Sequence, residues 1–426
     1  MIRSLWISKT GLDAQQTNMD VISNNLANVS TNGFKRGRAV FEDLLYQTLR
    51  QPGAQSSQQT QLPSGLQVGT GVRPVATERI FTQGNMQQTG NPLDVAINGG
   101  GFYRMSQNGV ITYSRNGQFH LDSQGYLVDS NDLHVTGYGV DASGNVVATS
   151  PTDIQISTSD LAPSPTGKFG ASMNLDARAS VPVTGAFSQT DPSSYTSTTS
   201  GTVYDSLGNA HVFSLYLVKT ATSGQWKAYG SIDGSALANV NLGSGAGNPA
   251  TINFNSSGAL TTAMPLTATL TLTNGAVTPL TTTLDFTGTT QYGANFSVNA
   301  LTQNGYTSGR LSGMNIGSDG TISGRYSNGQ TKNLGQIVLA SFANPEGLKP
   351  LGDDQWSESS DSGLPVVGVP GSGSLGVVQS SAVEDSNVDL TAELVNMITA
   401  QRAYQANAQT IKTQDEVLQT LVNLKQ

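Results

Sequence analysis

The sequence predicts a multi-domain α+β protein in which long N- and C-terminal helices form a coiled-coil-like inner domain and two all-β domains project outward. Apolar residues repeat every seven positions at both ends of the chain. Residues 85–380 alternate short β-type runs with Gly, Asn, Asp and Ser and show almost no helical period. The 426 residues also exceed the roughly 250–300 that one hydrophobic core supports.

The N-terminal helix is expected between residues 4 and 29, with Ser4 as its N-cap. A row of apolar side chains follows one face of this helix. Its members at seven-residue spacing are Leu5, Leu12, Met19 and Leu26. Ile22 and Val29 each lie three residues after one of the last two. Such a stripe needs a partner, because each exposed Leu-sized side chain forgoes about 1.5–3 kcal/mol of burial.

The C-terminal helix is expected to run for about 35 residues from Asp389, which is placed to cap it. Its apolar row consists of Leu390, Met397, Tyr404, Ile411 and Leu418, joined by Leu394, Ala408, Leu421 and Val422. We expect the two terminal helices to pair with each other and with copies of themselves in neighbouring subunits. The alternative is that both helices pack on an ordinary domain.

The region between the helices divides by composition. Residues 38–75 form a polar connector, expected to be flexible or extended from residue 50 onward. Residues 76–150 and 331–383 are assigned to a first β domain, and residues 151–330 to a second. The second is a sandwich or barrel, because Asn-Gly pairs mark its hairpin turns and residues 234–284 carry no charge. The remaining residues, 1–37 and 384–426, make up the helical domain.

Composition excludes several functions. The formal net charge is −8 with only 12% charged residues, which argues against nucleic-acid binding, because neutralising phosphates requires a basic excess. The absence of cysteine excludes disulfides, thiolate catalysis and Cys-type zinc sites. No segment approaches the ~20 apolar residues of a membrane span. The N-terminal apolar run is too short for a signal peptide, so an export route without a cleaved signal is expected.

Nothing in the sequence predicts catalysis, a cofactor or a metal site. The three histidines, His120, His134 and His211, stand isolated among strand residues and lack metal-ligand spacing. The side chains of the adjacent acidic pairs Glu42/Asp43, Asp353/Asp354 and Glu384/Asp385 diverge on a strand or helix, and such pairs are typical of solvated surface. The expectation is therefore a protein that is not an enzyme.

Residues 23–36, Ser-Asn-Asn-Leu-Ala-Asn-Val-Ser-Thr-Asn-Gly-Phe-Lys-Arg, resemble the N-terminal signature of the bacterial flagellar rod and hook proteins. The residues of this sequence that match the signature are Asn25, Asn28, Asn32, Gly33, Phe34 and Lys35. Locally, the asparagines can bond to backbone as the helix ends, Gly33 can adopt a left-handed conformation, and Phe34 can anchor the returning chain.

Residues 386–415 resemble the terminal helix of the same family, and their last part is most similar to its hook members. Residues 201–211 and 334–344 are also similar to hook proteins. In contrast, residues 41–48 and the connector to Gly71 look more like the distal rod protein. Hook proteins commonly have a shorter connector there, so we expect the longer one to add contacts between subunits that stiffen or straighten the assembly.

The resemblance implies a structural subunit of the flagellar hook, which polymerises into a tubular universal joint that transmits torque. It implies as partners the chain itself, the distal rod protein, the hook cap, the hook–filament junction proteins and the export apparatus. The implied location is the extracellular flagellum, with no nucleic-acid partner and no insertion into a membrane. Two alternatives remain open: a distal rod component, and a secreted β-rich adhesin or carbohydrate-active enzyme.

Overall fold

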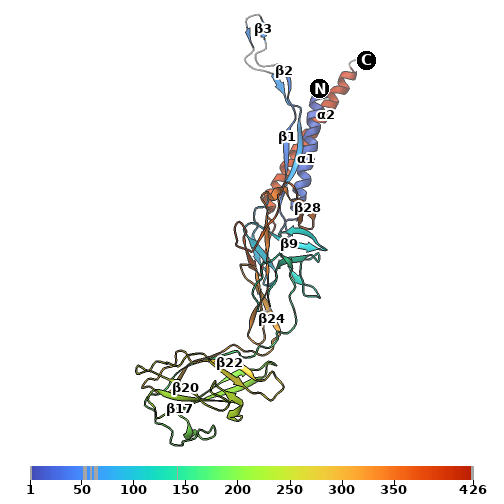
Figure 1. The fold of residues 1–426 in the computed structure, drawn as a ribbon. Helices are drawn as coiled ribbons and strands as arrows, with labels where there is room; N and C mark the ends of the chain where they lie inside the picture. The colour runs from blue at the N-terminus through green and yellow to red at the C-terminus, as the bar shows by residue number, and fades with distance from the viewer. Residues whose placement is uncertain (1, 51–54, 58–59, 62–65, 142, 424–426) are drawn as a thin grey trace. The chain divides into compact units, whose positions relative to one another are not determined.

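The computed structural model describes residues 2–50, 55–57, 60–61, 66–141 and 143–423. The chain forms two compact units. The first domain contains residues 1–157, 314–324 and 332–426, and the second contains residues 158–313 and 325–331. Two long helices and many strands make up the described chain, as the sequence predicted (Figure 1).

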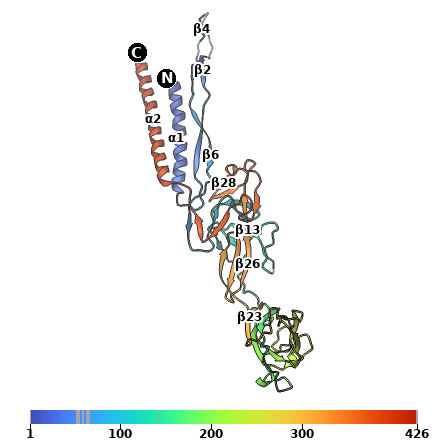
Figure 2. The same ribbon diagram turned by 90° about the vertical axis from the view of Figure 1, so that its left-hand side faces the viewer.

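The two helices belong to the first domain, lie side by side and run antiparallel (Figures 1 and 2). Helix α1 spans Ile2–Ala27, so Ser4 lies inside its first turn and the prediction of Ser4 as N-cap is wrong. Helix α2 spans Leu390–Asn423. The Asp389 cap is confirmed, because its Oδ1 accepts hydrogen bonds from the backbone N–H groups of Thr391 and Ala392, at 2.9 and 3.0 Å.

The connector after α1 is a long antiparallel hairpin among its described residues. Strand β1 (Gly37–Asp43) pairs with β6 (Val72–Arg79), and β2 (Gln47–Arg50) pairs with β5 (Leu66–Val68). A short pair, β3 (Gln55–Ser57) and β4 (Thr60–Gln61), follows. The connector that was expected to be flexible or extended is therefore paired over its described residues, because polar strands satisfy their backbone groups across the hairpin. The rest of the connector, residues 51–54, 58–59 and 62–65, lies outside the described residues.

The body of the first domain is built on an antiparallel sheet whose strands differ in length. Its central order is β26-β13-β9-β10-β29-β28. Phe102, Tyr113 and Trp356 of this sheet, with Phe342 after β27 and Phe81 after β6, form a core of edge-to-face rings. Two short pairs, β31 with β8 and β32 with β7, join the C-terminal part of the chain to the segment after the hairpin.

The strands of this body have the following bounds: β7 (Met86–Gln88), β8 (Val95–Asn98), β9 (Phe102–Gln107), β10 (Val110–Ser114), β11 (His120–Leu121), β12 (Leu127–Val128), β13 (His134–Tyr138), β14 (Thr152–Asp153), β26 (Thr331–Ile337), β27 (Leu339–Ser341), β28 (Lys349–Gly352), β29 (Gln355–Ser357), β30 (Val366–Gly368), β31 (Val377–Ser380) and β32 (Ala382–Glu384). Strands β24 (Leu311–Ile316) and β25 (Thr321–Tyr326) precede β26 in sequence.

The second domain contains two sheets, of orders β19-β21-β22-β15-β23 and β16-β17-β18-β20. Every second side chain of β17 is buried, from His211 to Leu217, as expected for a strand with one face on a core. Both sheets contribute to that core: Phe169 of β15 meets Phe213 of β17 edge to face at 5.3 Å, and Trp226 of β18 is fully buried.

The strand bounds of the second domain are β15 (Lys168–Asn174), β16 (Ser197–Tyr204), β17 (Ala210–Lys219), β18 (Gln225–Ile232), β19 (Val240–Asn241), β20 (Ala250–Asn253), β21 (Leu266–Leu270), β22 (Leu280–Asp285) and β23 (Ser297–Gln303). Short 3₁₀ turns occur at Pro192–Ser194, Leu237–Asn239 and, in the first domain, Pro345–Gly347.

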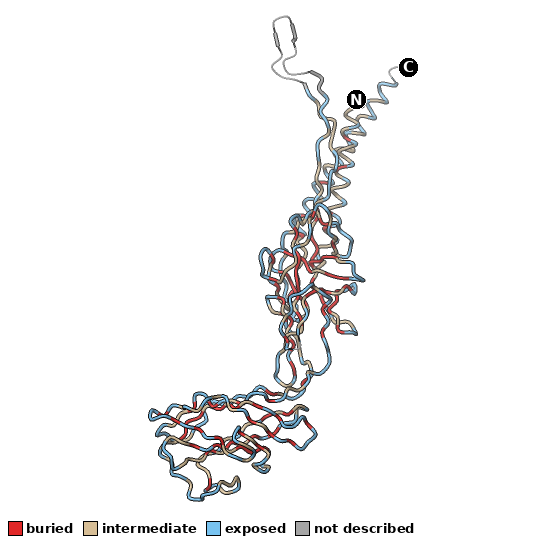
Figure 3. Tube along the Cα trace, in the orientation of Figure 1, coloured by how far each residue is buried: buried red, intermediate tan, exposed pale blue. Residues whose placement is uncertain are grey.

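Burial is concentrated in the β-rich parts of the two domains, whereas the helices are mostly half-buried or exposed (Figure 3). The helix pair therefore has little core of its own within a single chain.

Candidate assembly site

Helices α1 and α2 lie close together where Gly11 of α1 faces Asn407 of α2. A Cβ atom placed on Gly11 would lie 2.9 Å from Nδ2 of Asn407, so α1 and α2 approach more closely here than a larger residue allows. Ser8 and Ala14 of α1 and Ala400 of α2 are buried. Small residues at such positions permit close helix contact without a wide apolar seam.

The predicted heptad rows lie beside this contact and are mostly half-buried. Ile22 is buried, whereas Leu390 and Leu394 are exposed. The half-buried members are Leu5, Leu12, Met19, Leu26, Met397, Tyr404, Ile411 and Leu418. Because α1 lies between α2 and the β1–β6 hairpin, its buried positions include some outside the predicted row (Figure 2). Gly11, which meets Asn407 of α2, was not part of the predicted apolar row.

An apolar patch on the first turns of α2 lacks cover in the single chain. We call Leu390, Leu394, Val395 and Ile398 the α2 patch; each is between 44% and 58% exposed. Further along the helix, Val417, Leu421 and Val422 are also exposed. Contiguous exposed apolar side chains of this kind mark protein–protein contact surfaces.

The motif residues after α1 form a tight turn that only glycine allows. Gly33 has φ = 79°, and a Cβ atom there would lie 2.7 Å from the backbone N of Asn116. Its N–H donates a 2.7 Å hydrogen bond to the carbonyl of Glu384, just before α2. Gly33 therefore joins the end of α1 to the segment that leads into α2.

The asparagines of the motif differ in role. Asn25 is buried and pairs with the backbone of Gly37 in both directions, each bond being 2.8 Å long. Asn28 donates from Nδ2 to the carbonyl of Asn24 at 2.9 Å, which satisfies a backbone group at the helix end. Asn32 is half-buried.

Phe34 and Lys35 continue the motif into the domain interior. The buried ring of Phe34 lies 5.3 Å from the guanidinium of Arg79, which also donates to the carbonyl of Lys35 at 3.0 Å. The side chain of Lys35 is fully buried and its Nζ lies 2.6 Å from Oε1 of Glu384. Its second hydrogen bond goes to the carbonyl of Thr82, at 2.9 Å.

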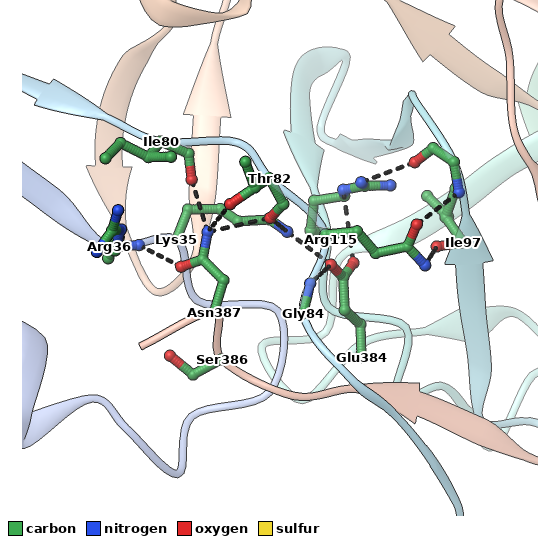
Figure 4. A network of polar contacts seen from close by, with 12 residues as sticks. Lys35, Arg36, Ile80, Thr82, Gly84, Ile97, Arg115, Glu384, Ser386 and Asn387 are labelled. Carbon is green, nitrogen blue, oxygen red and sulfur yellow. Dashed lines mark hydrogen bonds and ion pairs between the residues drawn. The ribbon is translucent and has the colours of Figure 1, made fainter. Parts of the chain in front are cut away.

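Glu384 also faces a second cation. Arg115 is buried and its Nε lies 3.6 Å from Oε2 of Glu384, while its Nη2 donates to the carbonyl of Gly99 at 2.9 Å. Burial, and secondarily the charge of Arg115, lower the pKa of Lys35 from its ordinary value, although Glu384 acts in the opposite direction. One carboxylate thus balances two buried cations (Figure 4).

Asn387 completes this buried junction from the C-terminal side. Its Oδ1 accepts from the backbone N–H of Arg36 at 2.7 Å, and its Nδ2 donates to the carbonyls of Ile80 and Thr82 at 2.8 and 3.0 Å (Figure 4). We call Lys35, Arg115, Glu384 and Asn387 with Gly33 the junction. It connects the segment after α1, the segment after β6 and the segment before α2, so it determines where both helices leave the β domain.

The sequence analysis predicted Glu384 and Asp385, as an adjacent acidic pair, to be solvated surface. For Glu384 this prediction is wrong, because its side chain is fully buried beside Lys35 and Arg115. Asn387 was not singled out. Glu384 and Asn387 occur within or next to the stretch that resembles the terminal helix of the rod and hook proteins, but nothing in the sequence paired them with Lys35. Among the described residues no group of three or more His, Asp or Glu side chains could hold a metal ion. The contacts of the junction are charge balance and hydrogen bonds.

Comparisons with known proteins place these features in one family. Family models match residues 6–35 (flagella basal body rod protein), 96–168 (flagellar hook protein FlgE/F/G D1 domain), 174–306 (flagellar basal body protein FlaE D2 domain) and 379–424 (flagellar basal body rod FlgEFG protein C-terminal). The flagellar hook proteins FlgE of Escherichia coli K12 and Salmonella typhimurium LT2 are each 42% identical over 98% of both chains. The flagellar basal-body rod protein FlgG of Buchnera aphidicola (Schizaphis graminum) is 34% identical over the full length of both.

We expect Gly33→Ala to destabilise the first domain more than Gly90→Ala. Both glycines have φ = 79°, but a Cβ on Gly90 meets nothing within 4 Å, whereas one on Gly33 meets the backbone of Asn116. Gly90→Ala should cost only the left-handed conformation, about 1–2 kcal/mol. Gly33→Ala should cost at least about 1 kcal/mol more in the free energy of unfolding, measured in urea. Equal losses would contradict the role of Gly33 in the junction.

We expect Lys35→Met to lower the free energy of unfolding of the first domain by about 3–5 kcal/mol, because it leaves the buried charge of Glu384 without its closest partner. The control is Arg38→Met at the exposed Arg38–Glu78 pair, expected to cost less than about 1 kcal/mol. Glu384→Gln introduced together with Lys35→Met should recover part of the loss. Urea unfolding that shows similar, small effects for both single variants would refute the importance of the buried pair.

Proposed function

Because this chain belongs to the flagellar hook protein (FlgE) family, of which the members are structural subunits of the bacterial flagellar hook, we propose that it polymerises through its terminal helices into the tubular hook. The α2 patch is the observation that supports this proposal. A single chain leaves these apolar side chains in water, and a neighbouring subunit would bury them. The distal-rod and adhesin alternatives are not favoured by the matching hook relatives.

The geometry of such a polymer follows from its single subunit type. When one surface of a subunit binds a different surface of the next, each subunit is rotated relative to the one before. If these rotations do not close a ring, the product is an open helical assembly. The α2 patch would supply one of these surfaces. The tightly joined helices and junction would transmit force from each subunit to the next, as a universal joint that carries torque requires.

The family places the chain in the hook and basal body of the flagellum. Beyond contacts with its own copies, we propose contacts with the distal rod protein, the hook cap and the hook–filament junction proteins at the two ends of the tube, and passage through the flagellar export apparatus without a cleaved signal peptide. No helix of the described chain is long and apolar enough to cross a bilayer.

The hairpin after α1 is a second proposed contact surface between subunits. Ion pairs Arg38–Glu78 and Arg73–Glu42 connect its strands, at 2.8 and 3.0 Å. Beyond them Leu45 is 89% exposed and Tyr46 lies beside it on the surface. A paired hairpin is stiffer than a flexible connector, so contact of this surface with a neighbour would restrict bending. This is how the rod-like connector would stiffen or straighten the hook.

We expect Leu394→Asp to block polymerisation while the monomer stays folded. Leu394 is exposed in the single chain, so a charge there costs little until a neighbour covers it. Loss of one Leu contact, about 1.5–3 kcal/mol, corresponds to a 10- to 100-fold higher critical concentration. Leu394→Met is the control and should assemble normally. Sedimentation and electron microscopy measure assembly, and normal tubes from Leu394→Asp would contradict the proposed surface.

We expect deletion of residues 50–65 to yield tubes that are more curved and bend more easily, because the β3–β4 pair would be lost from the connector. Electron cryomicroscopy of assembled tubes measures curvature, and fluctuation of their contour measures stiffness. A replacement of the same sixteen residues by a Gly/Ser segment of equal length is the control for chain length. Unchanged curvature and stiffness in tubes of the deletion variant would refute the stiffening hypothesis.

A further inference from the structure

His211, in the second domain, lies between two carboxylates. Its Nδ1 is 2.6 Å from Oδ2 of Asp233 and its Nε2 is 3.2 Å from Oδ2 of Asp205. The imidazole is about 10% exposed and the side chain of Asp205 is fully buried, whereas that of Asp233 is half exposed. The histidine that looked isolated in the sequence is therefore the centre of an ionic cluster.

The cluster connects the two sheets of the domain. Asp205 follows β16, His211 lies on β17 and Asp233 follows β18, all in one sheet. Asn274, in the loop between β21 and β22 of the other sheet, donates from Nδ2 to Oδ2 of Asp205 at 2.6 Å. A continuous chain of polar contacts thus runs from Asp233 through His211 and Asp205 to Asn274.

The geometry favours a protonated imidazole, although Nε2 also lies 3.3 Å from Nδ2 of Asn274. Both ring nitrogens face carboxylate oxygens, and only the imidazolium donates from both. Burial alone lowers the pKa of His211, but its hydrogen bonds to Asp233 and Asp205 outweigh burial and hold the pKa above the ordinary value. Burial likewise raises the pKa of Asp205, but donors led by Asn209 and Asn274 hold it well below its usual range. Asp205 thus stays ionised beside the imidazolium.

We propose that His211 is a pH-sensitive lock that fixes the turn after β18 to the β21–β22 loop through Asp205 and Asn274. The charged groups that face its ring are Asp205 from the turn after β16 and Asp233 from the turn after β18; the β21–β22 loop contributes the uncharged Asn274. When the ring loses a proton, one carboxylate faces a lone pair. Asp205 keeps donors from Leu207, Asn209 and Asn274, whereas the half-exposed Asp233 keeps the Val212 N–H, 2.8 Å from its Oδ1, so the His211–Asp233 contact is the one that weakens.

The direction of the pH effect follows from linkage. Because the folded state raises the pKa of His211, the stabilisation is complete below its unfolded pKa of about 6.5 and is lost as the pH rises through the folded pKa. The second domain should therefore loosen at the β18 turn at alkaline pH. This inference does not depend on polymerisation or on the proposed function.

The first test is an NMR titration of the full chain. The chain has three histidines, so His120→Gln and His134→Gln assign the signal of His211 by elimination. We expect His211 to titrate above the ordinary value of about 6.5. Asp233→Asn, at a half-exposed position that tolerates the amide, should move the midpoint down. A midpoint at or below the ordinary value, or one unmoved by Asp233→Asn, would overturn the proposal.

The second test compares hydrogen exchange of wild type and His211→Gln at the same pH, so that intrinsic exchange rates cancel. At pH 6 the variant should exchange faster over residues 230–235, and at a pH above the His211 midpoint found in the titration the difference should shrink because wild-type His211 has then lost its proton. His134→Gln, which removes a surface His–Asp pair from the first domain, is the control and should leave this segment unchanged. A difference of equal size at both pH values indicates a merely structural histidine and refutes the lock.

Discussion

The buried ion pair between Lys35 and Glu384 is the constraint on which the arrangement of the helices depends. Its partners are separated by 349 residues in sequence, and both side chains are fully buried. A buried charge that loses its partner is costly, so this contact allows one relative placement of the segments after α1 and before α2. Asn387 and Gly33 strengthen that placement through hydrogen bonds to backbone groups. The two helices therefore emerge together although they are the two ends of the chain.

The helices themselves are incomplete within one chain. Gly11 meets Asn407 of α2, the helices bury few large apolar side chains, and the α2 patch remains in water. The β domains, in contrast, have dense aromatic and aliphatic cores. Stability is thus supplied by the β domains, while the helices keep exposed apolar surface, as the proposed contact with other copies requires. This division suits a subunit that must fold alone and then polymerise.

Prediction from the sequence succeeded where a pattern is local. Seven-residue spacing predicted both helices, and Asp389 before an apolar row predicted a cap that the structure confirms. The motif from Asn25 to Lys35 was found as a family signature. Its partners were not found, because Glu384 and Arg115 are ordinary charged residues until the fold buries them beside Lys35. His211 was missed for the same reason: its two carboxylates come from turns that only the sheet brings together.

The sequence by itself determined the order of the elements, the two terminal helices, the β-rich middle and the family to which the chain is similar, since each depends on periodicity, turn residues or motifs along the chain. Tertiary structure alone decided which polar groups pair, which faces of the helices are buried and that the polar connector forms a hairpin. The physical reason is that desolvation and pairing energies depend on neighbours distant in sequence. Gly33 illustrates both contributions. In the sequence a glycine at this position indicates a turn, but in the structure the backbone of Asn116 leaves no room for any other side chain.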